Sequence, residues 1–421
     1  MSLRIPRLLV QCALCGLGAG ALAPTQAADA LTLEQAAALA ARRAPLVAAG
    51  REREAAAAAD LDRAGRLPDP TLQFGVQNLP VQGSGAYTFS ADPTTMRYVG
   101  VNQEIPSSAA LAARRSTALA DAQRARADRR QATFAARQGA AAAWVELWAA
   151  QRAQQQLGEL ARQATLAIHA AQARLAGATG SATDVLAARA QAAEIDNRRD
   201  AVAADEARAR ASLARWIGAR QADAVLGDAP DFARLPAPEA QLLSSPDAQA
   251  PLLEWGPRID AARAALQQAR ATLAPDWSVG ASYAVRAPGL PSMAAVQVGV
   301  RLPLFARHRE DADVDARDAE LRALQQQRDD ARRAQLADVA RTVAAWRGWN
   351  AQVARDETTL LALAHDRART ALAAYAGGGA LQPWLDADNA EIQTRLSYVD
   401  ALAARARAWV ELAYLLPEEQ P

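Results

Sequence analysis

Side chains that could bind a metal ion or take part in catalysis are few and scattered in this chain of 421 residues. The histidines lie far apart in the sequence, and each falls on a segment with a helical pattern or at its start. An isolated histidine of this kind is more often solvated or packed than a metal ligand. The two methionines after Met1 form no visible thioether relay for soft metals. We therefore predict no cofactor, no metal site and no enzymatic activity; the residues considered are His169, His308, His365, Met96 and Met293.

Two glycine-containing turns carry the acidic residues that remain as candidates. Asp184 follows the first turn and Asp386 follows the second, each near the start of a predicted helix. A carboxylate in this place can cap the helix or interact with its dipole. The sequence leaves that structural role and a functional role open. Glycine accepts the unusual backbone angles that such turns need, and the turn glycines are Gly177, Gly180, Gly377, Gly378 and Gly379.

The composition favours extended helices over a thick globular core. Hydrophobic residues make up 51% of the chain but aromatic residues only 5%, and alanine supplies much of the difference. Alanine favours helix and allows helices to pack closely. The 47 basic residues are all arginine, the 46 acidic residues are interspersed with them, and the net charge is +1. Without a basic patch, nucleic acid is not an expected partner.

Residues 1–28 have the layout of a cleaved secretory signal. Arg4 and Arg7 precede an apolar run from Leu8 to Ala23, and small residues follow. This order is typical of a signal peptide. An N-terminal membrane anchor is the alternative, but the run is short for a transmembrane helix. Both cysteines, Cys12 and Cys15, lie inside this segment, so we expect a mature chain without disulfides.

Four short segments alternate between apolar and polar or small residues. They lie at about 70–79, 97–105, 276–286 and 294–303. Alternation over about ten residues is typical of a tilted transmembrane strand with one lipid face and one wet face. A soluble sheet with one buried face fits the same pattern. No later stretch approaches ~20 apolar residues, so the chain could enter a membrane only through these strands. Nearby aromatic residues could form an interfacial girdle: Phe74, Tyr87, Phe89, Tyr98, Trp277 and Tyr283.

The rest of the chain is predicted to be helical. Two segments, Ser107–Ala176 and His308–Ala376, contain no proline, and each would be about 100 Å long as a helix. The 3-4 spacing of small and apolar residues from Ala150 to Ala171 predicts a coiled-coil seam. A similar stripe runs from Leu336 to Val353. Shorter helices are expected at Leu33–Arg66, Asp184–Trp216, Arg258–Leu273 and Leu385–Leu415.

The chain also repeats itself. Val99-Gly-Val101 matches Val298-Gly-Val300 at an offset of 199 residues, and the same offset pairs Gly180 with Gly379. Each repeat has the order helix, strand, strand, long helix, helix. We therefore divide the chain into a signal (1–28), a first repeat (29–218), an irregular Pro-rich connecting segment (219–256), a second repeat (257–416) and a tail (417–421).

The geometry of a membrane sheet adds a further expectation. Unpaired backbone groups in lipid cost several kcal/mol each, so an open sheet edge is not tolerated there. Four strands cannot close a barrel around a lumen, whereas three copies would supply twelve. If the strands are in a membrane, the chain is therefore an oligomer.

These residues resemble the TolC-type outer-membrane factors, the exit ducts of tripartite efflux pumps and type I secretion systems. The resemblance covers essentially the whole mature chain. It rests on the order and duplication of several motifs: the opening Leu31–Ala36, the strand entry Pro68–Pro70, the strand exit Leu302–Phe305 and the turns Leu175–Leu186 and Tyr375–Asp386. The strand exit looks most like the branch that serves heavy-metal pumps of the RND type.

The resemblance implies a mainly α fold with a β-barrel part. It implies a homotrimer with a twelve-stranded barrel in the outer membrane and a coiled-coil α-helical tunnel across the periplasm. It implies a passive exit duct, for heavy-metal cations in that branch, fed by an inner-membrane RND pump through a periplasmic adaptor.

The same resemblance assigns roles to the two turns. In the family, aspartates on the second-repeat turn line the periplasmic aperture, and Asp386 occupies the matching position. A second family aspartate three residues earlier is replaced here by Pro383, which puts a two-ring gate in doubt, and Asp388 is a weaker substitute. The turn glycines would lie where the adaptor docks.

Two other functions remain open at this point. The chain could be the outer-membrane channel of a type I secretion system. From a different class, it could be a periplasmic coiled-coil adaptor or scaffold. Two full repeats with only four strands argue against an adaptor, which carries one helical hairpin within a β-domain.

Overall fold

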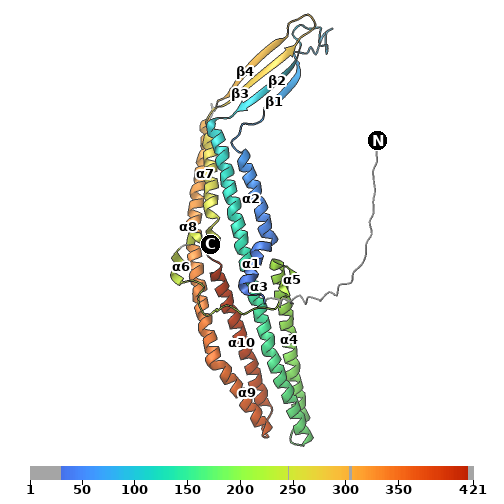
Figure 1. The fold of residues 1–421 in the computed structure, drawn as a ribbon, viewed down its shortest axis with the longest axis vertical. Helices are drawn as coiled ribbons and strands as arrows, with labels where there is room; N and C mark the ends of the chain where they lie inside the picture. The colour runs from blue at the N-terminus through green and yellow to red at the C-terminus, as the bar shows by residue number, and fades with distance from the viewer. Residues whose placement is uncertain (1–29, 245, 303–305, 416–421) are drawn as a thin grey trace, which may run out of the picture.

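The computed structural model describes residues 30–244, 246–302 and 306–415. It is an elongated molecule with a small sheet at one end and two helical hairpins that end together at the other (Figure 1). The predicted signal segment, most of the Leu302–Phe305 motif and the predicted tail lie outside the described residues.

The elements follow the predicted repeat order. The N-terminal half contains α1 (Leu33–Arg43), α2 (Pro45–Arg63), β1 (Thr71–Gln77), β2 (Met96–Ile105), α3 (Ser108–Ala176) and α4 (Ala182–Ile217). Short helices form the connection: α5 (Ala219–Ala222), α6 (Glu239–Ser244), η1 (Pro246–Ala248) and η2 (Ala250–Leu252). The C-terminal half contains α7 (Trp255–Ala271), β3 (Asp276–Val285), β4 (Met293–Arg301), α8 (Ala306–Arg355), η3 (Asp356–Leu360), α9 (Leu361–Ala376) and α10 (Gln382–Ala413).

Two of the predicted helices are interrupted. The helix expected over Leu33–Arg66 breaks at Ala44, which has φ −59° and ψ 127°. The residue before a proline disfavours the helical region, and Pro45 then starts α2 as its first residue. In the second half, the π-helical turn η3 lies between α8 and α9. A π turn holds one more residue than an α turn, so the second repeat gains one residue there.

The sheet has the order β1-β2-β3-β4, and every neighbouring pair is antiparallel. In the described chain, β1 and β4 each pair on one side only, so both edges of the sheet are free. The connection between β2 and α3 is short, and Ser107 caps α3 by accepting a hydrogen bond from the Ala110 amide (3.1 Å). Asp276 at the start of β3 accepts a hydrogen bond from the Ser107 amide (2.9 Å), which joins the two repeats where the sheet meets the helices.

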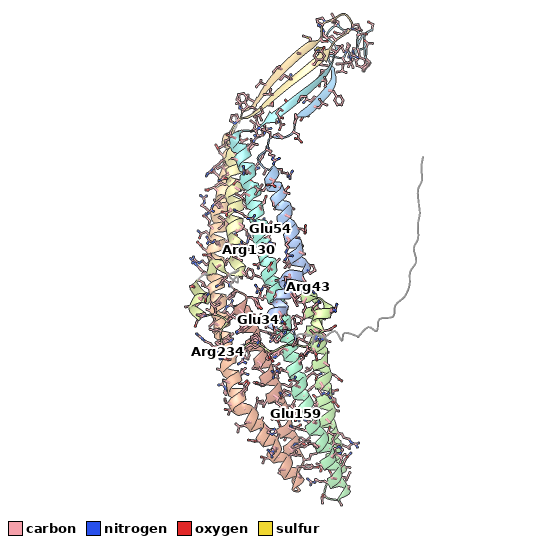
Figure 2. The ribbon with its side chains drawn as sticks, viewed as in Figure 1. Glu34, Arg43, Glu54, Arg130, Glu159 and Arg234 are labelled. Carbon is pink, nitrogen blue, oxygen red and sulfur yellow. The ribbon has the colours of Figure 1, made fainter. Side chains whose placement is uncertain are left out.

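The core is a narrow seam along the helices. Every position of the predicted seam on α3 is buried, so this stripe faces the neighbouring helices. Leu157 and Leu160 pack there against Ile195 of α4 and Ile392 of α10. Because the seam is mostly alanine, the helices approach closely and little apolar volume separates them. Charged side chains such as Glu34, Arg43 and Glu159 stand along the outside of the helices (Figure 2).

The connecting segment is fixed at mid-length of the helices by tryptophans from both repeats. Phe232 packs edge-on against Trp148 and Trp409, with ring centroids 5.7 and 5.4 Å away. The Trp346 indole donates to the Phe232 carbonyl (3.0 Å), and the Trp409 indole donates to the Arg234 carbonyl (2.8 Å). The segment therefore packs across both repeats.

None of the helices formed by the described residues combines the length and the hydropathy that a transmembrane helix needs.

Candidate functional site

One face of the sheet is apolar and exposed. The strand register places Leu72, Val101, Ala281 and Val296 in one row across it, with Phe74, Val99 and Tyr283 in a neighbouring row. Phe74 is 80% exposed and Val296 is 75% exposed. Large apolar side chains in contiguous exposed rows mark a surface that contacts something other than water.

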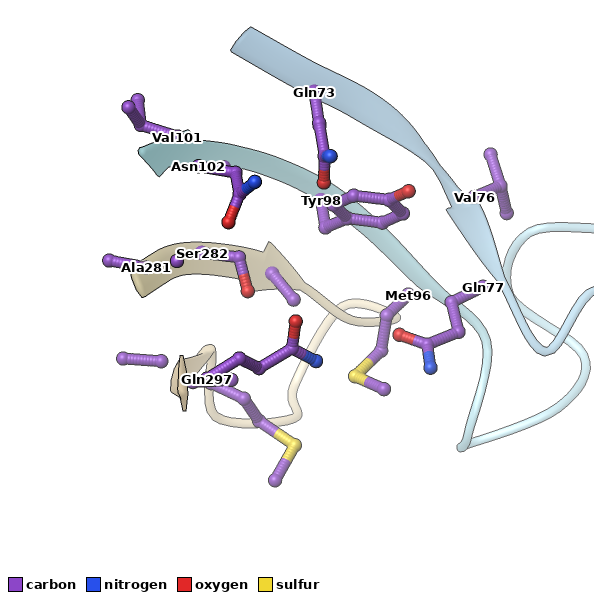
Figure 3. Close-up of a pocket in the computed structure, with 16 residues that line it drawn as sticks. Gln73, Val76, Gln77, Met96, Tyr98, Val101, Asn102, Ala281, Ser282 and Gln297 are labelled. Carbon is purple, nitrogen blue, oxygen red and sulfur yellow. The ribbon is translucent and has the colours of Figure 1, made fainter. Parts of the chain in front are cut away.

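The opposite face of the sheet is polar and hollow. A cavity of about 750 Å³ lies over it, and glutamine, asparagine and serine side chains project into it (Figure 3). Its lining includes Gln73, Gln77, Asn102, Ser282 and Gln297. The sheet therefore has two different faces, as the alternation predicts, one apolar and one polar.

One of the girdle candidates lies apart from the others on the sheet. Tyr98, considered as a girdle residue, lies on the polar face, where a Cβ added to Gly75 would meet its ring at 3.1 Å. Tyr98 fills the space that a side chain at position 75 would occupy. Met96 and Met293 both line the polar cavity. The other girdle candidates are exposed: Phe74, Tyr87, Phe89, Trp277 and Tyr283.

The two hairpin turns have nearly the same backbone path at their starts. Gly177 and Gly377 end α3 and α9, and their amides donate to Ala173 and Ala373 (3.0 Å each). The next residue has a positive φ in both turns, 56° at Ala178 and 107° at Gly378. Gly177 is therefore equivalent to Gly377, and Ala178 to Gly378. The expected pairing of Gly180 with Gly379 is therefore wrong by one residue. The extra residue of η3 explains the shift, because η3 lies between the strands and the turn in the second repeat.

The turn glycines serve different purposes. Among the five candidates, only Gly378 has a positive φ. At Gly180 a Cβ would lie 2.8 Å from the Cβ of Arg174, and at Gly379 it would lie 2.9 Å from the Ala374 carbonyl. These two glycines are needed for close approach within the turn, and the expected positive φ does not occur at Gly177, Gly180, Gly377 or Gly379.

Arg174 joins the two turns, a role that the sequence did not indicate. Its guanidinium donates to the carbonyls of Tyr375 and Gly379 in the second turn (3.1 Å for Gly379). It also donates to the Thr179 carbonyl of its own turn (3.0 Å) and stacks 4.3 Å from the centre of the Tyr375 ring. Arg174 thus adds a second hydrogen bond to the Tyr375 carbonyl, which also accepts from the Gly378 amide, and binds the Gly379 carbonyl in the turn after α9.

The two candidate aspartates occupy different environments. Asp184 forms a capping box with Ser181: its amide donates to the Ser181 hydroxyl (3.1 Å), and its carboxylate accepts from the Ser181 amide (3.4 Å). Asp386 lies on the exposed side of α10 and accepts a bond from Gln382 (2.8 Å). The capping role therefore applies to Asp184, while Asp386 remains on the surface.

Asp388 is not on the surface. It is 2% exposed and accepts a hydrogen bond from Gln191 of α4 (3.0 Å). Burial raises the pKa of Asp388; the Gln191 bond lowers it and the charge of Glu391 raises it. In this chain, Asp388 is a buried contact between the two hairpins and does not substitute for an aperture residue.

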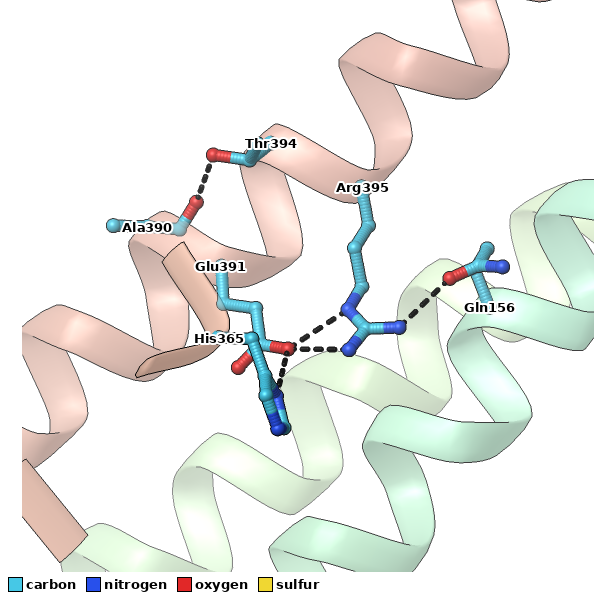
Figure 4. A network of polar contacts seen from close by, with 6 residues as sticks. All are labelled: Gln156, His365, Ala390, Glu391, Thr394 and Arg395. Carbon is cyan, nitrogen blue, oxygen red and sulfur yellow. Dashed lines mark hydrogen bonds and ion pairs between the residues drawn. The ribbon is translucent and has the colours of Figure 1, made fainter. Parts of the chain in front are cut away.

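Glu391, one turn further along α10, is 1% exposed. Its Oε1 atom accepts from the Arg395 guanidinium (2.9 Å at Nε) and lies 3.2 Å from Nδ1 of His365 (Figure 4). Arg395 also donates to Gln156 of α3 (2.9 Å). This network ties α10 to both α9 and α3.

No group of three or more metal-binding side chains occurs among the described residues. His365 bonds to Glu391, His169 lies on α3 apart from it, and the side chain of His308 lies outside the described part.

Comparison with known proteins agrees with this architecture. Residues 247–417 match the family model described as outer membrane efflux protein, which confirms the resemblance to the TolC-type family. The matched family consists of efflux proteins, which agrees with the expectation that this chain is not an enzyme. No curated protein matches the chain.

Solved structures share the fold over almost the whole chain. One is CusC, which is 17% identical, with 91% of this chain and 92% of that chain covered and a TM-score of 0.75. Another is the outer membrane channel CmeC of Campylobacter jejuni, at 11% identity, 99% and 96% coverage and a TM-score of 0.75. A third is the outer membrane protein VceC of Vibrio cholerae, at 17% identity, 91% and 96% coverage and a TM-score of 0.73.

Proposed function

Since the family match confirms the resemblance to TolC-type outer-membrane efflux proteins, we propose that this chain is a subunit of an outer-membrane channel. It is the passive exit duct of a tripartite efflux system, and it receives substrates from an inner-membrane RND-type pump through a periplasmic adaptor. The observation that carries this proposal is the sheet, with an exposed apolar face, a hollow polar face and two unpaired edges.

The sheet supports a trimer. Its apolar face suits lipid, and its polar face suits a water-filled lumen. The free edges of β1 and β4 must then pair with other copies, because unpaired backbone groups are not tolerated in lipid. Three copies give a closed barrel of twelve strands, and the helices below it form a tunnel across the periplasm.

The proposed function assigns a role to each part of the chain. Residues 1–28 are the export signal, 29–218 and 257–416 are the two repeats, 219–256 is the connecting segment and 417–421 is the tail. Heavy-metal cations are the cargo class that the resemblance of the strand exit favours. A type I secretion channel is the alternative role for the same architecture.

The hairpin turns are the proposed periplasmic end. Asp386 is the better gate candidate of the two aspartates, because it is exposed whereas Asp184 is held in a capping box. Three symmetry-related carboxylates at position 386 would repel one another and attract cations. The turns that contain Gly177, Gly180 and Gly377–Gly379 are the proposed adaptor contact.

Cell fractionation and cross-linking test the channel. We expect the full chain in the outer membrane, extracted only by detergent and cross-linked as a trimer. Val298→Arg, on the apolar face, should abolish assembly, because arginine in the middle of a lipid face costs about 2–4 kcal/mol. Gln297→Arg, the neighbouring position on the polar face, should assemble normally. A soluble or inner-membrane monomer would contradict the proposal.

Planar-bilayer recordings test the gate separately. Asp386→Ala should raise the conductance or reduce block by cations, while Asp184→Ala should change the conductance less. If Asp386→Ala behaves like the wild type, Asp386 is not the gate.

A further inference from the structure

A small cavity lies between the two hairpins, close to their turns. It has a volume of about 180 Å³ and is walled by α3 of the first hairpin and by α9 and α10 of the second. Its lining combines polar and charged side chains with the apolar Leu166, Leu372 and buried Trp384, and Leu166 is 66% exposed. An apolar cavity of about 150 Å³ can hold a benzene ring, so by volume this cavity has room for a small aromatic molecule.

The cavity also has two acidic side chains in its lining. Asp388 and Glu391 both line it, and they are 2% and 1% exposed. The Oε2 atom of Glu391 is buried and has no hydrogen-bond partner within the described residues. A buried polar atom without a partner is costly, so each such atom calls for an explanation.

The two acidic side chains of the cavity differ in their ion pairing. Arg395 is bonded to Glu391 and compensates its charge. Asp388 accepts a hydrogen bond from the neutral Gln191 amide, and within the described chain no arginine or histidine forms an ion pair with it. A buried carboxylate without a cation is unfavourable. Arg369 also lines the cavity but forms no ion pair with Asp388, so within the described chain no cationic side chain is bonded to this carboxylate.

The first hairpin shows that packing does not require this carboxylate. The two turns are equivalent at an offset of 200 residues, since α4 begins at Ala182 and α10 at Gln382. At this offset Ala188 is the equivalent of Asp388, and Gln191 is the equivalent of Glu391. Ala188 is 1% exposed, and Asp388 is buried to a similar extent. The same buried position is filled by a methyl group in one hairpin and by a carboxylate in the other.

We propose that this cavity binds a small organic cation, consisting of a primary ammonium group on an apolar body about the size of a benzene ring. The ammonium group donates hydrogen bonds to the carboxylates of Asp388 and Glu391. The apolar body packs against Leu166 and Leu372, and the ring of Trp384 adds a favourable contact with the cation. Because the walls come from both hairpins, the bound cation stabilises the packed arrangement of the two.

Binding should depend on pH. The ionised form of Asp388 is the one that attracts the ammonium group, so affinity increases as the pH rises through the raised pKa of Asp388. The groups that face this site are the neutral Gln163 of α3 and Gln191 of α4, His365 and Arg369 of α9, and Glu391 and Arg395 of α10.

Fluorine NMR titration of the purified full chain in detergent tests the site, with 4-fluorobenzylammonium as the probe and 4-fluorobenzyl alcohol as the neutral probe of equal size. We expect saturable binding of the ammonium probe, and binding of the alcohol weaker by roughly tenfold or more, as for the loss of one charge-assisted hydrogen bond. Asp388→Asn keeps an acceptor for Gln191 but removes the charge, and should weaken binding of the ammonium probe by a similar factor.

Two further variants keep the test decisive. Ala368→Leu should fill the cavity and abolish binding without a change of charge, because Ala368 lines it and is buried. Asp366→Asn removes an exposed charge from the same helix and should bind the probe like the wild type. The proposal is overturned if the wild type shows no saturable binding, if the alcohol binds as tightly as the ammonium probe, or if Asp388→Asn binds like the wild type. None of these measurements depends on whether the chain forms a channel.

Discussion

The two hairpin turns begin along the same path and differ in how they use charge. In the first turn, the Ser181 hydroxyl and the Asp184 carboxylate cap the returning helix. In the second turn, α10 starts without a side-chain cap, with Pro383 in its first turn. The second turn is instead held by Arg174 from the first. The first hairpin is thus locally complete, and the second depends on it.

The two hairpins also differ in charge along their returning helices, one and two helical turns beyond the hairpin turns. Ala188 and Gln191 of the first hairpin correspond to Asp388 and Glu391 of the second, and all four are buried. Uncharged side chains in one repeat have become carboxylates in the other. We infer that the first hairpin provides the fixed support and that the second hairpin carries the buried acidic groups.

The largest expected effect comes from introducing into the first hairpin the buried carboxylate that the second hairpin has at the equivalent position. Ala188→Asp buries a carboxylate at a position that packs as a methyl group, and should destabilise the helical part by about 3 kcal/mol or more. Asp388→Ala, the reverse change, should cost much less, because it removes a buried charge along with one hydrogen bond. Thermal unfolding of the two variants, followed by circular dichroism, measures the difference. Equal losses would mean that the two hairpins tolerate a buried charge equally well.

The next effect concerns the contact between the turns. Arg174→Ala removes hydrogen bonds to three carbonyls and the stacking on Tyr375, and should cost about 2–3 kcal/mol, confined to the turns. Hydrogen exchange measured by mass spectrometry should accelerate in the second turn more than in the first. Arg174→Lys keeps the charge but loses the planar guanidinium group, so its hydrogen exchange rate in the second turn should lie between those of the wild type and Arg174→Ala. Faster exchange in the first turn alone would show that the second turn is not the dependent one.

Much of this architecture was predictable from the sequence, because the seam of α3 and the alternation of the strands are local periodic patterns. The register of the turns was not predictable. A single extra residue within η3 shifts the equivalence of the two repeats by one position, and an unbroken helical pattern does not reveal a π turn. Arg174 and Asp388 were missed or undervalued for a related reason: their partners lie in the opposite repeat, and one arginine or aspartate among many has no local signal.

A smaller effect tests the shared backbone of the turns. Gly378 has φ 107° and Ala178 has φ 56°. A side chain at positive φ costs roughly 1–2 kcal/mol, so Gly378→Ala should destabilise the second turn by about 1 kcal/mol. Ala178→Gly should relieve the strain in the first turn and leave its stability equal or slightly higher. Local hydrogen exchange distinguishes the two, and a stabilising Gly378→Ala would contradict the equivalence of the positions.

The smallest effect is the pH dependence of the second hairpin. The pKa of Asp388 is raised in the folded chain above the ordinary value of 3.8, so the folded chain holds this proton to a higher pH than the unfolded chain does. As the pH falls from neutral through the raised pKa towards 3.8, protonation of Asp388 therefore increases the free energy of unfolding. Asp388→Asn should remove this part of the pH dependence, whereas Asp386→Asn should leave it in place because Asp386 is exposed. Hydrogen exchange of α10 between pH 4 and pH 7, corrected for the intrinsic rate, measures the change. A profile that is the same in Asp388→Asn and the wild type would show that the buried acid does not control how tightly the second hairpin packs on the first.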